Sequence, residues 1–371
     1  MNKRTVLASS VLAGTVVGVG IFSLPYITSR VGLLTMSAYF IALGGVSVLI
    51  HLFFGEIALK SPDFKRLPGL VKTYLGKKAE KVSFVSSILG LSGAVLAYLI
   101  VGGEFLASFL MPYLGQSQLF YTLVYFFIGS AFIFSGIKAI ARVEFWAVVL
   151  FILVLTAIFF KAGQQDLISF SNLFSSFGQR DLFLPYGAVL FSLWGISVVP
   201  EMEEMLGNDK RMLKSSILAG MAVSIAVSFL FVILVLGITG LETVESALPG
   251  LEGILGKGTM SLTLLFGLAA TFTSFVTLGL TLKKVFCYDL NKGEKLSWAL
   301  SCFPALILFL LGIKSFIGVI SFVGGVMIGL DGFLVILIYQ KIKGKRCRIV
   351  TLPLAILLLF GIVYEIIYFL T

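Results

Sequence analysis

Charged side chains, histidine and cysteine are all scarce in this chain of 371 residues. Asp, Glu, Lys and Arg together make up 12% of it, whereas a soluble domain carries about 25% charged residues. The cysteines, Cys287, Cys302 and Cys347, form no Cys-x-x-Cys pair, so nothing predicts a disulfide. No HExxH motif, hydrolase elbow or phosphate-binding GxxxxGKS/T loop occurs. The sequence therefore disfavours an enzyme and predicts no cofactor.

Apolar residues, in contrast, are abundant. They form 58% of the chain, and the mean hydropathy is +1.07. A helix needs about 20 apolar residues to cross the hydrocarbon core of a bilayer. We therefore predict an all-α polytopic membrane protein of the cell membrane, with residues 1–371 forming a single transmembrane domain. The sequence gives eleven predicted spans, at residues 6–28, 33–59, 83–110, 118–136, 143–161, 184–205, 214–237, 258–282, 297–313, 315–339 and 350–370.

The basic residues predict which way these spans run. With the N-terminus in the cytoplasm, 23 of the 28 Lys and Arg residues fall on the cytoplasmic segments. Such an excess is what the positive-inside rule describes. An odd number of spans then places the C-terminus outside. The net charge of +10 is accordingly a signal of orientation and not of nucleic-acid binding, because no basic run is interleaved with exposed aromatic residues.

Two apolar segments are interrupted by glycine and proline in corresponding places. Residues 11–25 have the sequence VLAGTVVGVGIFSLP, and residues 185–201 have PYGAVLFSLWGISVVPE. A broken helix survives in lipid only where it is buried in protein or lines a watery cavity. Paired breaks in the two halves of a chain indicate the binding site of a secondary transporter. The alternative is that Gly18 and Gly20 only allow helices to pack closely.

The positions of the breaks divide the chain into two repeats. Spans one to five form repeat one (5–161), and spans six to ten form repeat two (184–339). Because five is odd, the second repeat enters the membrane from the opposite side, which gives a 5+5 inverted-topology repeat. The eleventh span, 350–370, lies outside it.

These segments also resemble a known family. GTVVGVGIFSLPY at 14–26 resembles the first-helix signature of the amino acid/auxin permease family, and FSLWGISVVPEMEEM at 191–205 resembles its sixth helix. That family is a branch of the amino acid–polyamine–organocation superfamily, which also includes bacterial aromatic amino acid permeases. The resemblance covers essentially the whole chain. It implies the leucine-transporter (LeuT-type) fold, with helices 1 and 6 broken, and transport by alternating access.

The breaks offer a site for a zwitterion. Amide groups at the start of the second half-helix, together with the helix dipole, suit an α-carboxylate, and carbonyls freed in the sixth span suit an α-ammonium group. No acid or base lies in either break, which favours a neutral, apolar or aromatic substrate. Aromatic residues at such spacing also occur as ordinary packing. The predicted substrate-binding residues are Gly18, Gly20, Ile21, Phe22, Tyr98, Phe191, Ser192, Trp194 and Gly195.

A coupling ion is predicted from the eighth span. Ala270, Thr273 and Ser274 share one helical face there, and freed carbonyls at Gly14 and Val17 complete five neutral oxygens for Na⁺. This Ala-x-x-Thr-Ser pattern resembles the sodium site shared by many transporters of the fold. In some proton-coupled relatives a Lys on span five occupies that site, and span five here has none before its outer end. The alternative is that the hydroxyls bond back to the preceding turn.

Ionisable residues within spans are functional candidates. Asp331 in span ten is predicted to be a proton carrier or part of an inner gate; the alternative is that a neighbouring Ser or Thr, or an Arg or Lys at the cytoplasmic end, simply holds it. Of Glu201, Glu203 and Glu204 at the inner end of span six, at most one is predicted to form a gate salt bridge, and Glu201 is the candidate. Asp331 with Glu104 or Glu201 would in principle form a carboxylate pair for an intramembrane enzyme. Glu104 itself is expected to be a boundary residue, and His51 a satisfied packing residue away from the breaks.

Two connections between spans are long enough to interpret. Residues 60–82 carry seven basic residues and are expected to be a solvated loop that sets orientation near anionic lipid. Residues 238–257 suggest two short amphipathic helical pieces broken at Pro249 and Gly250, either an external lid or an ordinary connector.

Together these features predict a Na⁺-coupled importer of a neutral amino acid that works by alternating access. A proton-coupled symporter of the same fold and a non-transporting amino acid sensor are the alternatives. The expected partners are the small-molecule substrate and the lipid bilayer, and no obligate protein partner is evident.

Overall fold

The computed structural model describes residues 3–61, 65–136, 140–175, 182–207, 209–251, 254 and 257–370. In this part of the chain the regular structure is helical and no strand occurs. Seven helices are each long and apolar enough to cross a membrane, and a bent pair near the N-terminus makes an eighth candidate. The remaining predicted spans also fall on helices, one of which is interrupted, so each of the eleven predicted spans has a helical counterpart.

The first half of the chain contains the helices of predicted spans one to five. Most begin or end at a glycine whose positive φ angle favours this residue type, as at Gly115 and Gly136. The helices are α1 (Lys3–Val16), the 3₁₀ turn η1 (Val19–Ser23), α2 (Leu24–Val31), α3 (Leu33–Ala58), α4 (Leu67–Leu75), α5 (Lys77–Leu114), α6 (Gln118–Ser135) and α7 (Ile140–Gln164).

The second half repeats this order, beginning again with an interrupted helix. Its helices are α8 (Phe170–Phe174), α9 (Pro185–Ser192), η2 (Ile196–Val198), α10 (Val199–Leu206), α11 (Lys210–Thr239), the turns η3 (Gly240–Glu242) and η4 (Pro249–Leu251), α13 (Lys257–Lys284), α14 (Glu294–Leu310), α15 (Phe316–Phe322), α16 (Gly329–Lys343), η7 (Lys345–Cys347) and α17 (Arg348–Leu370). Two π-helices interrupt this half, η5 (Val285–Asp289) after α13 and η6 (Val323–Ile328) between α15 and α16.

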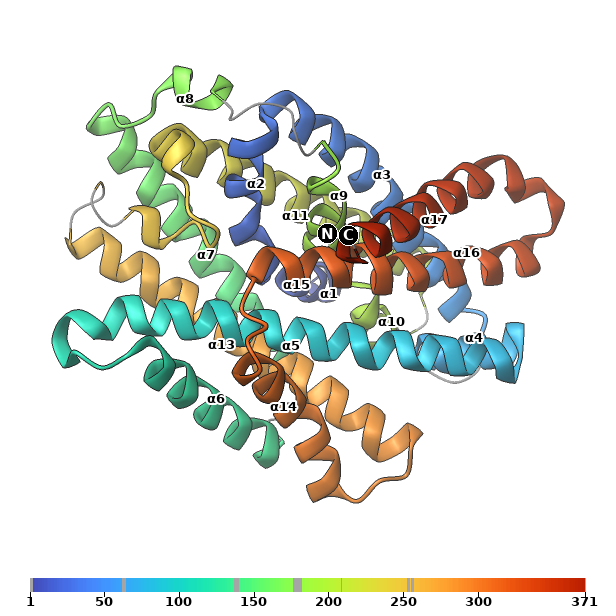
Figure 1. The fold of residues 1–371 in the computed structure, drawn as a ribbon. Coiled ribbons are helices and arrows are strands. Elements are labelled where there is room, and N and C mark those ends of the chain that lie inside the picture. The colour runs from blue at the N-terminus through green and yellow to red at the C-terminus, as the bar shows by residue number, and fades with distance from the viewer. Residues whose placement is uncertain are drawn as a thin grey trace.

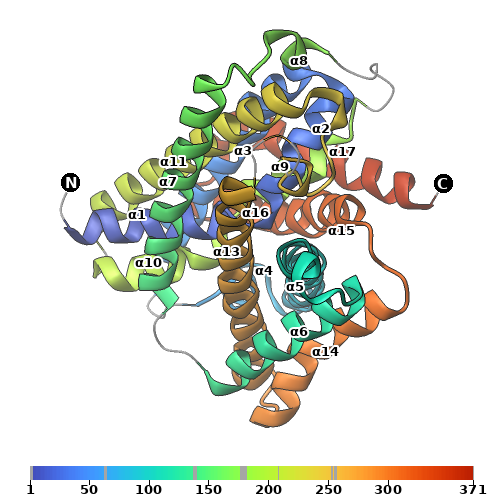
Figure 2. The same ribbon diagram turned by 90° about the vertical axis from the view of Figure 1, so that its left-hand side faces the viewer.

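The long helix α5 organises one side of the molecule. It crosses the lower part of Figure 1, with α6 and α14 below it. Figure 2 looks along α5 and shows α6, α14, α13 and α15 around it. The element contacts agree, because α5 packs against all four of these helices. On the other side α1 packs against α11 and α7, and α9 packs against η6 and α3.

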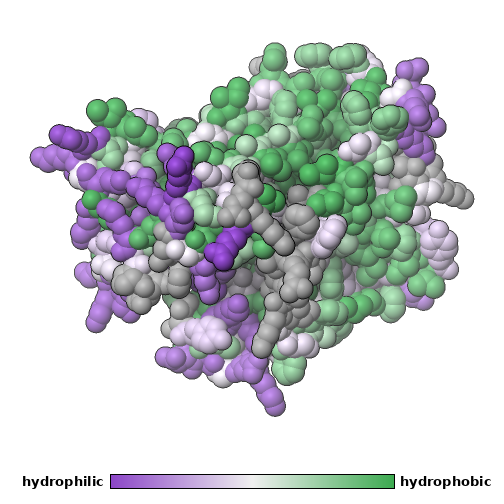
Figure 3. Space-filling view, turned by 180° about the vertical axis from the view of Figure 1, so that it is seen from behind, coloured by the Kyte–Doolittle hydropathy of each residue, from purple (hydrophilic) through white to green (hydrophobic). Residues whose placement is uncertain are grey.

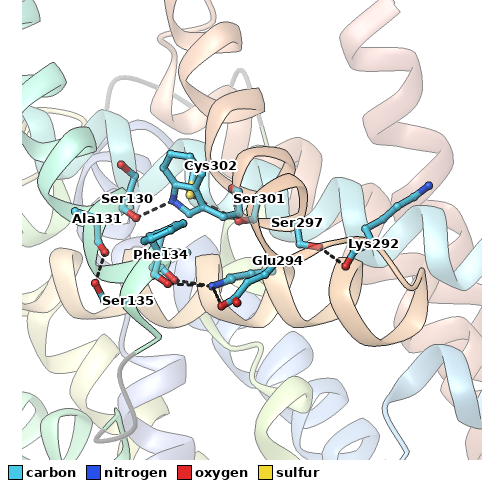
Figure 4. A network of polar contacts seen from close by, with 12 residues as sticks. Ser130, Ala131, Phe134, Ser135, Lys292, Glu294, Ser297, Ser301 and Cys302 are labelled. Atoms are coloured by element: carbon cyan, nitrogen blue, oxygen red, sulfur yellow. Dashed lines mark hydrogen bonds and ion pairs between the residues drawn. The ribbon is translucent and has the colours of Figure 1, made fainter.

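A polar network ties three helices of this side together (Figure 4). The buried ammonium group of Lys283, near the end of α13, donates to the Phe134 carbonyl (3.1 Å), which α6 leaves unpaired at its C-terminal end, and to Glu294 Oε1 (3.0 Å) at the start of α14. The Trp298 indole donates to the Ser130 carbonyl (2.8 Å). Each bond crosses from one helix to another, so the network fixes α6, α13 and α14 as one unit.

One face of the molecule is largely apolar. Figure 3 shows this broad hydrophobic face, with hydrophilic residues gathered at one edge and in smaller groups along the bottom and at the upper right. Many large apolar side chains point outward, for example Leu34 (79% exposed), Ile41 (79%) and Ile349 (85%). A lipid-covered protein has this distribution, since the bilayer solvates apolar side chains.

The segment at 60–82 is not the solvated loop that the sequence predicted. Residues 67–75 form α4, which buries Leu67, Leu70 and Val71 against α5 and α16. Pro68 lies in the first turn, where proline suits a helix. The basic residues of the segment stay at the surface while its apolar residues join the core, so α4 becomes part of the bundle.

The segment at 238–257 also packs on the bundle. Its described part contains the short turns η3 and η4, and Ala247, Leu248 and Leu251 are buried. The predicted break at Pro249 and Gly250 opens η4. Residues 252–253 and 255–256 of this prediction lie outside the described residues.

Candidate substrate cavity

The first break lies where α1 ends at Val16. The Gly18 N–H donates to the Val16 carbonyl (2.8 Å), and the Val19 N–H, which has no helical acceptor, donates to the Tyr98 hydroxyl of α5 (3.0 Å). The chain then continues as η1 and α2, bent by 47° from α1. Because a buried backbone N–H must find a partner, Tyr98 stabilises this break from a neighbouring helix.

The glycines of the first break are required by close contacts. A Cβ atom on Gly18 would lie 1.9 Å from the Tyr98 hydroxyl oxygen. A Cβ on Gly20 would lie 2.5 Å from Ser192 Oγ and 2.9 Å from Phe191 Cδ1. The last two residues belong to α9, so Gly20 is the point where the first break touches the broken sixth span.

The second break follows α9, which ends at Ser192. Here α3 supplies two side chains: the Ser47 hydroxyl donates to the Leu193 carbonyl, and the Gly195 N–H donates to His51 Nε2 (3.0 Å). His51 Nδ1 lies 2.7 Å from the Ser47 carbonyl, which can only accept. Both bonds are satisfied only by the neutral imidazole with its proton on Nδ1.

This arrangement corrects the expectation for His51. The side chain is satisfied, as predicted, but it does not lie away from the breaks. It is fully buried, bonds directly to the second break and contacts Trp194 edge to face, with ring centroids 5.6 Å apart. A lone histidine inside a span, one helical turn after a serine, was the signal that could have indicated a polar cap.

A cavity begins at these breaks and extends toward α4. Its empty space is about 1120 Å³, including solvent at its open end. Of the predicted substrate-binding residues, Gly18, Gly20, Tyr98, Phe191 and Trp194 line it. Further lining residues include Thr15, Phe54, Ser87, Ala94, Ser197, Thr281, Val323 and Met327.

The other predicted substrate residues lie behind this lining. Ser192 is buried and its hydroxyl donates back to the Ala188 carbonyl (2.7 Å). The Ile21 N–H points to the Gly18 carbonyl at 3.4 Å, a long hydrogen bond. The Phe22 ring is buried, and Gly195 is occupied by its bond to His51. The backbone of the breaks is thus partly satisfied from within the protein.

The two predicted coupling or gate residues both lie toward the α4 end. Asp331 lines the cavity, and its Oδ1 is buried without a hydrogen-bond partner among the described residues. Glu201 on α10 forms an ion pair with Arg66 at the start of α4 (Nη2 to Oε1, 3.2 Å), and Arg66 also lines the cavity. The ion pair therefore spans the mouth of the cavity between two helices.

The predicted sodium ligands lie on, or directly after, two helices that pack mainly against other helices. The Thr273 hydroxyl donates to the Ala270 carbonyl (3.1 Å), the back-bond that was the alternative interpretation. Ser274 is half-buried on the same helix, α13. Gly14 lies near the end of α1 and Val17 directly after it. Helix α1 packs mainly against α11 and α7, while α13 packs mainly against α5, α6 and α7. Neither group lines the cavity.

The opposite end of the cavity is closed by aromatic packing. Phe22 contacts Phe105 and Phe231 edge to face, with centroids 5.1 Å and 5.7 Å apart. Leu248 of the 238–257 segment and Phe105 both lie against Gly267 of α13. The Ser246 hydroxyl donates to Glu104 Oε1 (2.8 Å), so Glu104 anchors that segment.

Comparison with solved structures identifies the fold. Mhp1, a nucleobase-cation-symport-1 family transporter, in a closed conformation with bromovinylhydantoin bound, matches with a TM-score of 0.66 at 12% identity, over 93% of this chain and 80% of its own. MhsT in complex with L-phenylalanine matches with a TM-score of 0.62 at 16% identity, over 99% and 98%. A manganese transporter of Eremococcus coleocola gives 0.71 at 10%, over 98% and 87%. The fold is therefore the LeuT-type fold that the sequence predicted.

Sequence comparison gives the family. The chain is 23% identical over 348 residues to "Tyrosine-specific transport system 1" of Haemophilus influenzae, covering 87% of this chain and 84% of that protein. A family model described as the tryptophan/tyrosine permease family matches residues 1–368. This is not the amino acid/auxin permease family that the sequence suggested, and the predicted superfamily stays a prediction. The protein is a multi-pass membrane permease whose small-molecule substrate is an amino acid, and it is not an enzyme: the chain belongs to the tryptophan/tyrosine permease family.

Proposed function

We propose that this protein carries a neutral aromatic amino acid, tyrosine or tryptophan, across the cell membrane by alternating access. The observation that supports this most strongly is the cavity at the two helix breaks, lined by Tyr98, Phe191 and Trp194. A cavity at paired breaks is where a transporter of this fold binds its cargo. Three aromatic side chains suit an aromatic ring by stacking and edge contacts.

The backbone of the breaks supplies the polar contacts in this proposal. The α-carboxylate is placed near Gly18 and Gly20, at the positive end of η1 and α2. The α-ammonium group is placed near the carbonyl groups at the end of α9. The substrate side chain then points toward Trp194 and Phe191. Asp331 lies further along the same cavity, where it can attract the ammonium group on its way in or out.

The described conformation is interpreted as inward-facing. The cavity extends to Arg66 and Pro68 on the side that the basic residues predict to be cytoplasmic. The other side is closed by Phe22, Phe105 and the 238–257 segment. Alternating access then requires the inner mouth, which the Arg66–Glu201 ion pair already spans, to narrow around that pair while the aromatic group opens, so the predicted lid becomes an outer gate.

Two coupling ions remain as proposals. The first is Na⁺ at Gly14, Val17, Ala270, Thr273 and Ser274, which would need α1 and α13 to approach each other in another state of the cycle. The second is a proton. It is favoured by a specific observation: the carboxyl group of Asp331 is buried in the cavity beside Ser86, and its Oδ1 has no hydrogen-bond partner among the described residues. A carboxyl group inside a membrane domain is a common proton carrier.

Uptake into proteoliposomes tests these proposals. Labelled tyrosine, tryptophan, phenylalanine and leucine are supplied with an inward Na⁺ gradient, with a proton gradient alone, or with neither. We expect gradient-driven uptake of the aromatic amino acids and little uptake of leucine. Binding without uptake under any gradient would instead favour a sensor, and preference for leucine would contradict the assigned substrate class.

Two variants then separate the ions. If Na⁺ drives uptake, Thr273→Ala should abolish that dependence, while Thr156→Ala should not. Thr156 is a matched control because its hydroxyl makes the same back-bond, to the Ile152 carbonyl (2.7 Å), on the exposed face of α7. If protons drive uptake, Asp331→Asn should abolish accumulation, and the sodium site is discarded.

A further inference from the structure

A second buried carboxyl group lies outside the cavity, on the eleventh span. Glu365 belongs to α17, which neither repeat includes, and its side chain is 2% exposed. A carboxyl group inside a membrane domain is expensive to bury and is a functional candidate by default. The proposed transport site does not use it.

Glycines on two other spans make room for this side chain. A Cβ on Gly325, in the π-helix η6, would lie 2.2 Å from Glu365 Cγ, and a Cβ on Gly187, in α9, would lie 2.7 Å from Glu365 Oε1. The two spans also touch directly, since a Cβ on Gly324 would lie 1.8 Å from the Gly187 carbonyl oxygen. Glu365 thus sits at the junction of α9, η6 and α17.

The carboxylate has a defined partner at this junction. The Gly187 N–H donates to it. Gly187 lies in the first turn of α9, where backbone N–H groups have no helical acceptor, and α9 has no side-chain cap of its own. Glu365 therefore caps the outer half of the broken sixth span from another helix, at the positive end of its dipole.

The groups facing Glu365 are otherwise apolar or phenolic. Tyr186 of α9 and Tyr39 of α3 interact with it electrostatically, and Tyr364 of α17 lines one pocket together with these two tyrosines. Neither α15 nor η6 contains a titratable residue. Ser321, whose carbonyl borders Gly187, has a buried hydroxyl with no hydrogen-bond partner among the described residues.

This junction is one layer behind the substrate cavity. On α9, Phe191 lies one turn beyond Gly187 and lines the cavity, and a Cβ on Gly324 would lie 3.0 Å from Phe191 Cβ. On η6, Val323 and Met327 line the cavity as well. A π-helix is frequently found at functional sites. A change at Glu365 therefore reaches cavity residues through two elements that it contacts directly.

We propose that Glu365 is a proton-binding site whose occupancy controls how firmly α17 and η6 hold the outer half of the broken sixth span. The charged carboxylate caps α9 and holds the three elements together. Uptake of a proton from water removes the charge of the carboxylate and weakens its hydrogen bond from the Gly187 N–H. The protonated carboxyl group can then donate its O–H to an oxygen of Ser321. Loss of that proton to water reverses the step.

Burial links this proton to movement. In the described conformation Glu365 is 2% exposed and lies between three packed elements, α9, η6 and α17. Exchange of the proton then requires α9 to move away from η6 and α17, which is a movement of the outer gate. The inference rests on the proposed alternating access, because only a moving sixth span would expose Glu365 in turn.

The test measures α9 itself and needs no substrate. Hydrogen–deuterium exchange of the peptide containing residues 185–192 is followed for the full-length protein in lipid nanodiscs across a pH series, after correction for intrinsic exchange. In the wild type we expect exchange to rise roughly tenfold as pH falls, because a hydrogen bond to a charged group is about twice as strong as a neutral one. Glu365→Gln should exchange fast at every pH, and Glu365→Asp should keep a pH dependence.

The matched control is Glu80→Gln, which removes a surface carboxylate paired with Lys72 (3.0 Å) far from α9 and should behave as the wild type. Wild-type exchange that does not change with pH would overturn the proposal, even if Glu365→Gln fails to fold. A wild-type dependence that persists unchanged in Glu365→Gln would overturn it too. Tyrosine binding is measured separately on the same samples. A protein that does not bind tyrosine would contradict the proposed function, whereas the proton site at Glu365 is tested by the exchange result alone.

Discussion

At the first helix break, the freed backbone is bonded by a phenol that lines the cavity, and at the second, by an imidazole that does not. Tyr98 accepts from the Val19 N–H, and His51 accepts from the Gly195 N–H, both at 3.0 Å. The backbone requirement is the same, since each break leaves a buried donor without a helical acceptor. The surroundings differ, because only Tyr98 borders space that water or substrate can enter.

This difference assigns unequal roles to the two breaks. A donor beside the cavity can exchange its partner for a ligand group, so the first break is suited to bind. A donor sealed behind Trp194 and bonded by a tautomer that Ser47 fixes has no alternative partner, so the second break is suited to hold a shape.

The largest effect is expected where the two breaks touch. Gly20→Ala places a methyl group 2.5 Å from Ser192 Oγ and 3.0 Å from the Ser192 Cα, so the backbone of one break must shift from the other. Overpacking of this kind costs about 1–3 kcal/mol, which corresponds to a loss of roughly tenfold to hundredfold in tyrosine uptake. The measurement is initial uptake into proteoliposomes, normalised to inserted protein.

Gly45→Ala is the control for this substitution. Gly45 lies on the exposed face of α3, and a Cβ there would meet nothing within 4 Å. Uptake should stay within about twofold of the wild type, as expected for a surface change. Equal losses in the two variants would show that alanine acts through general helix effects and that the contact between the breaks has no special role.

The next effect concerns stability. His51→Phe keeps a ring of similar size but removes the acceptor for the Gly195 N–H and the bond to the Ser47 carbonyl. A buried donor without a partner costs about 1–3 kcal/mol, so we expect the melting temperature in detergent to fall by several degrees. Melting is measured with and without tyrosine. A variant as stable as the wild type would contradict the structural role of the second break.

The sequence predicted those parts of this arrangement that depend on residues close together in the chain. The spans and both breaks depend on local composition, so windows of apolar residues and the glycines around Gly20 were enough. The side chains that stabilise the breaks come from other helices: His51 is 144 residues from Gly195, and Tyr98 is 79 from Val19. No periodicity encodes such a pair. Tyr98 was named as an aromatic candidate, but its bond to the backbone was not foreseen.

Contacts between distant parts of the chain also explain why the prediction for the segment 60–82 failed and why Glu365 was missed. The segment 60–82 looked like a solvated loop because it carries seven basic residues and is interrupted by Pro62, Pro68 and Gly69. Leu67, Leu70 and Val71 nevertheless find a place against α5 and α16, which only the packed bundle creates. Glu365 was overlooked because it lies near the end of the last span, where a charged residue usually reaches water. The glycines that enclose it are on α9 and η6.

The smallest effect is expected at the first break. Tyr98→Phe removes the acceptor for the Val19 N–H while keeping the ring. Loss of one such bond is worth about 0.5–1.5 kcal/mol, and because the site borders the cavity, water can replace the phenol. We therefore expect the KM for tyrosine uptake to rise about three- to tenfold, with a melting temperature close to that of the wild type. Tyr98→Phe could instead destabilise the protein as much as His51→Phe and leave KM unchanged. The two breaks would then be structurally equivalent, and the proposal that the first break binds the substrate would be wrong.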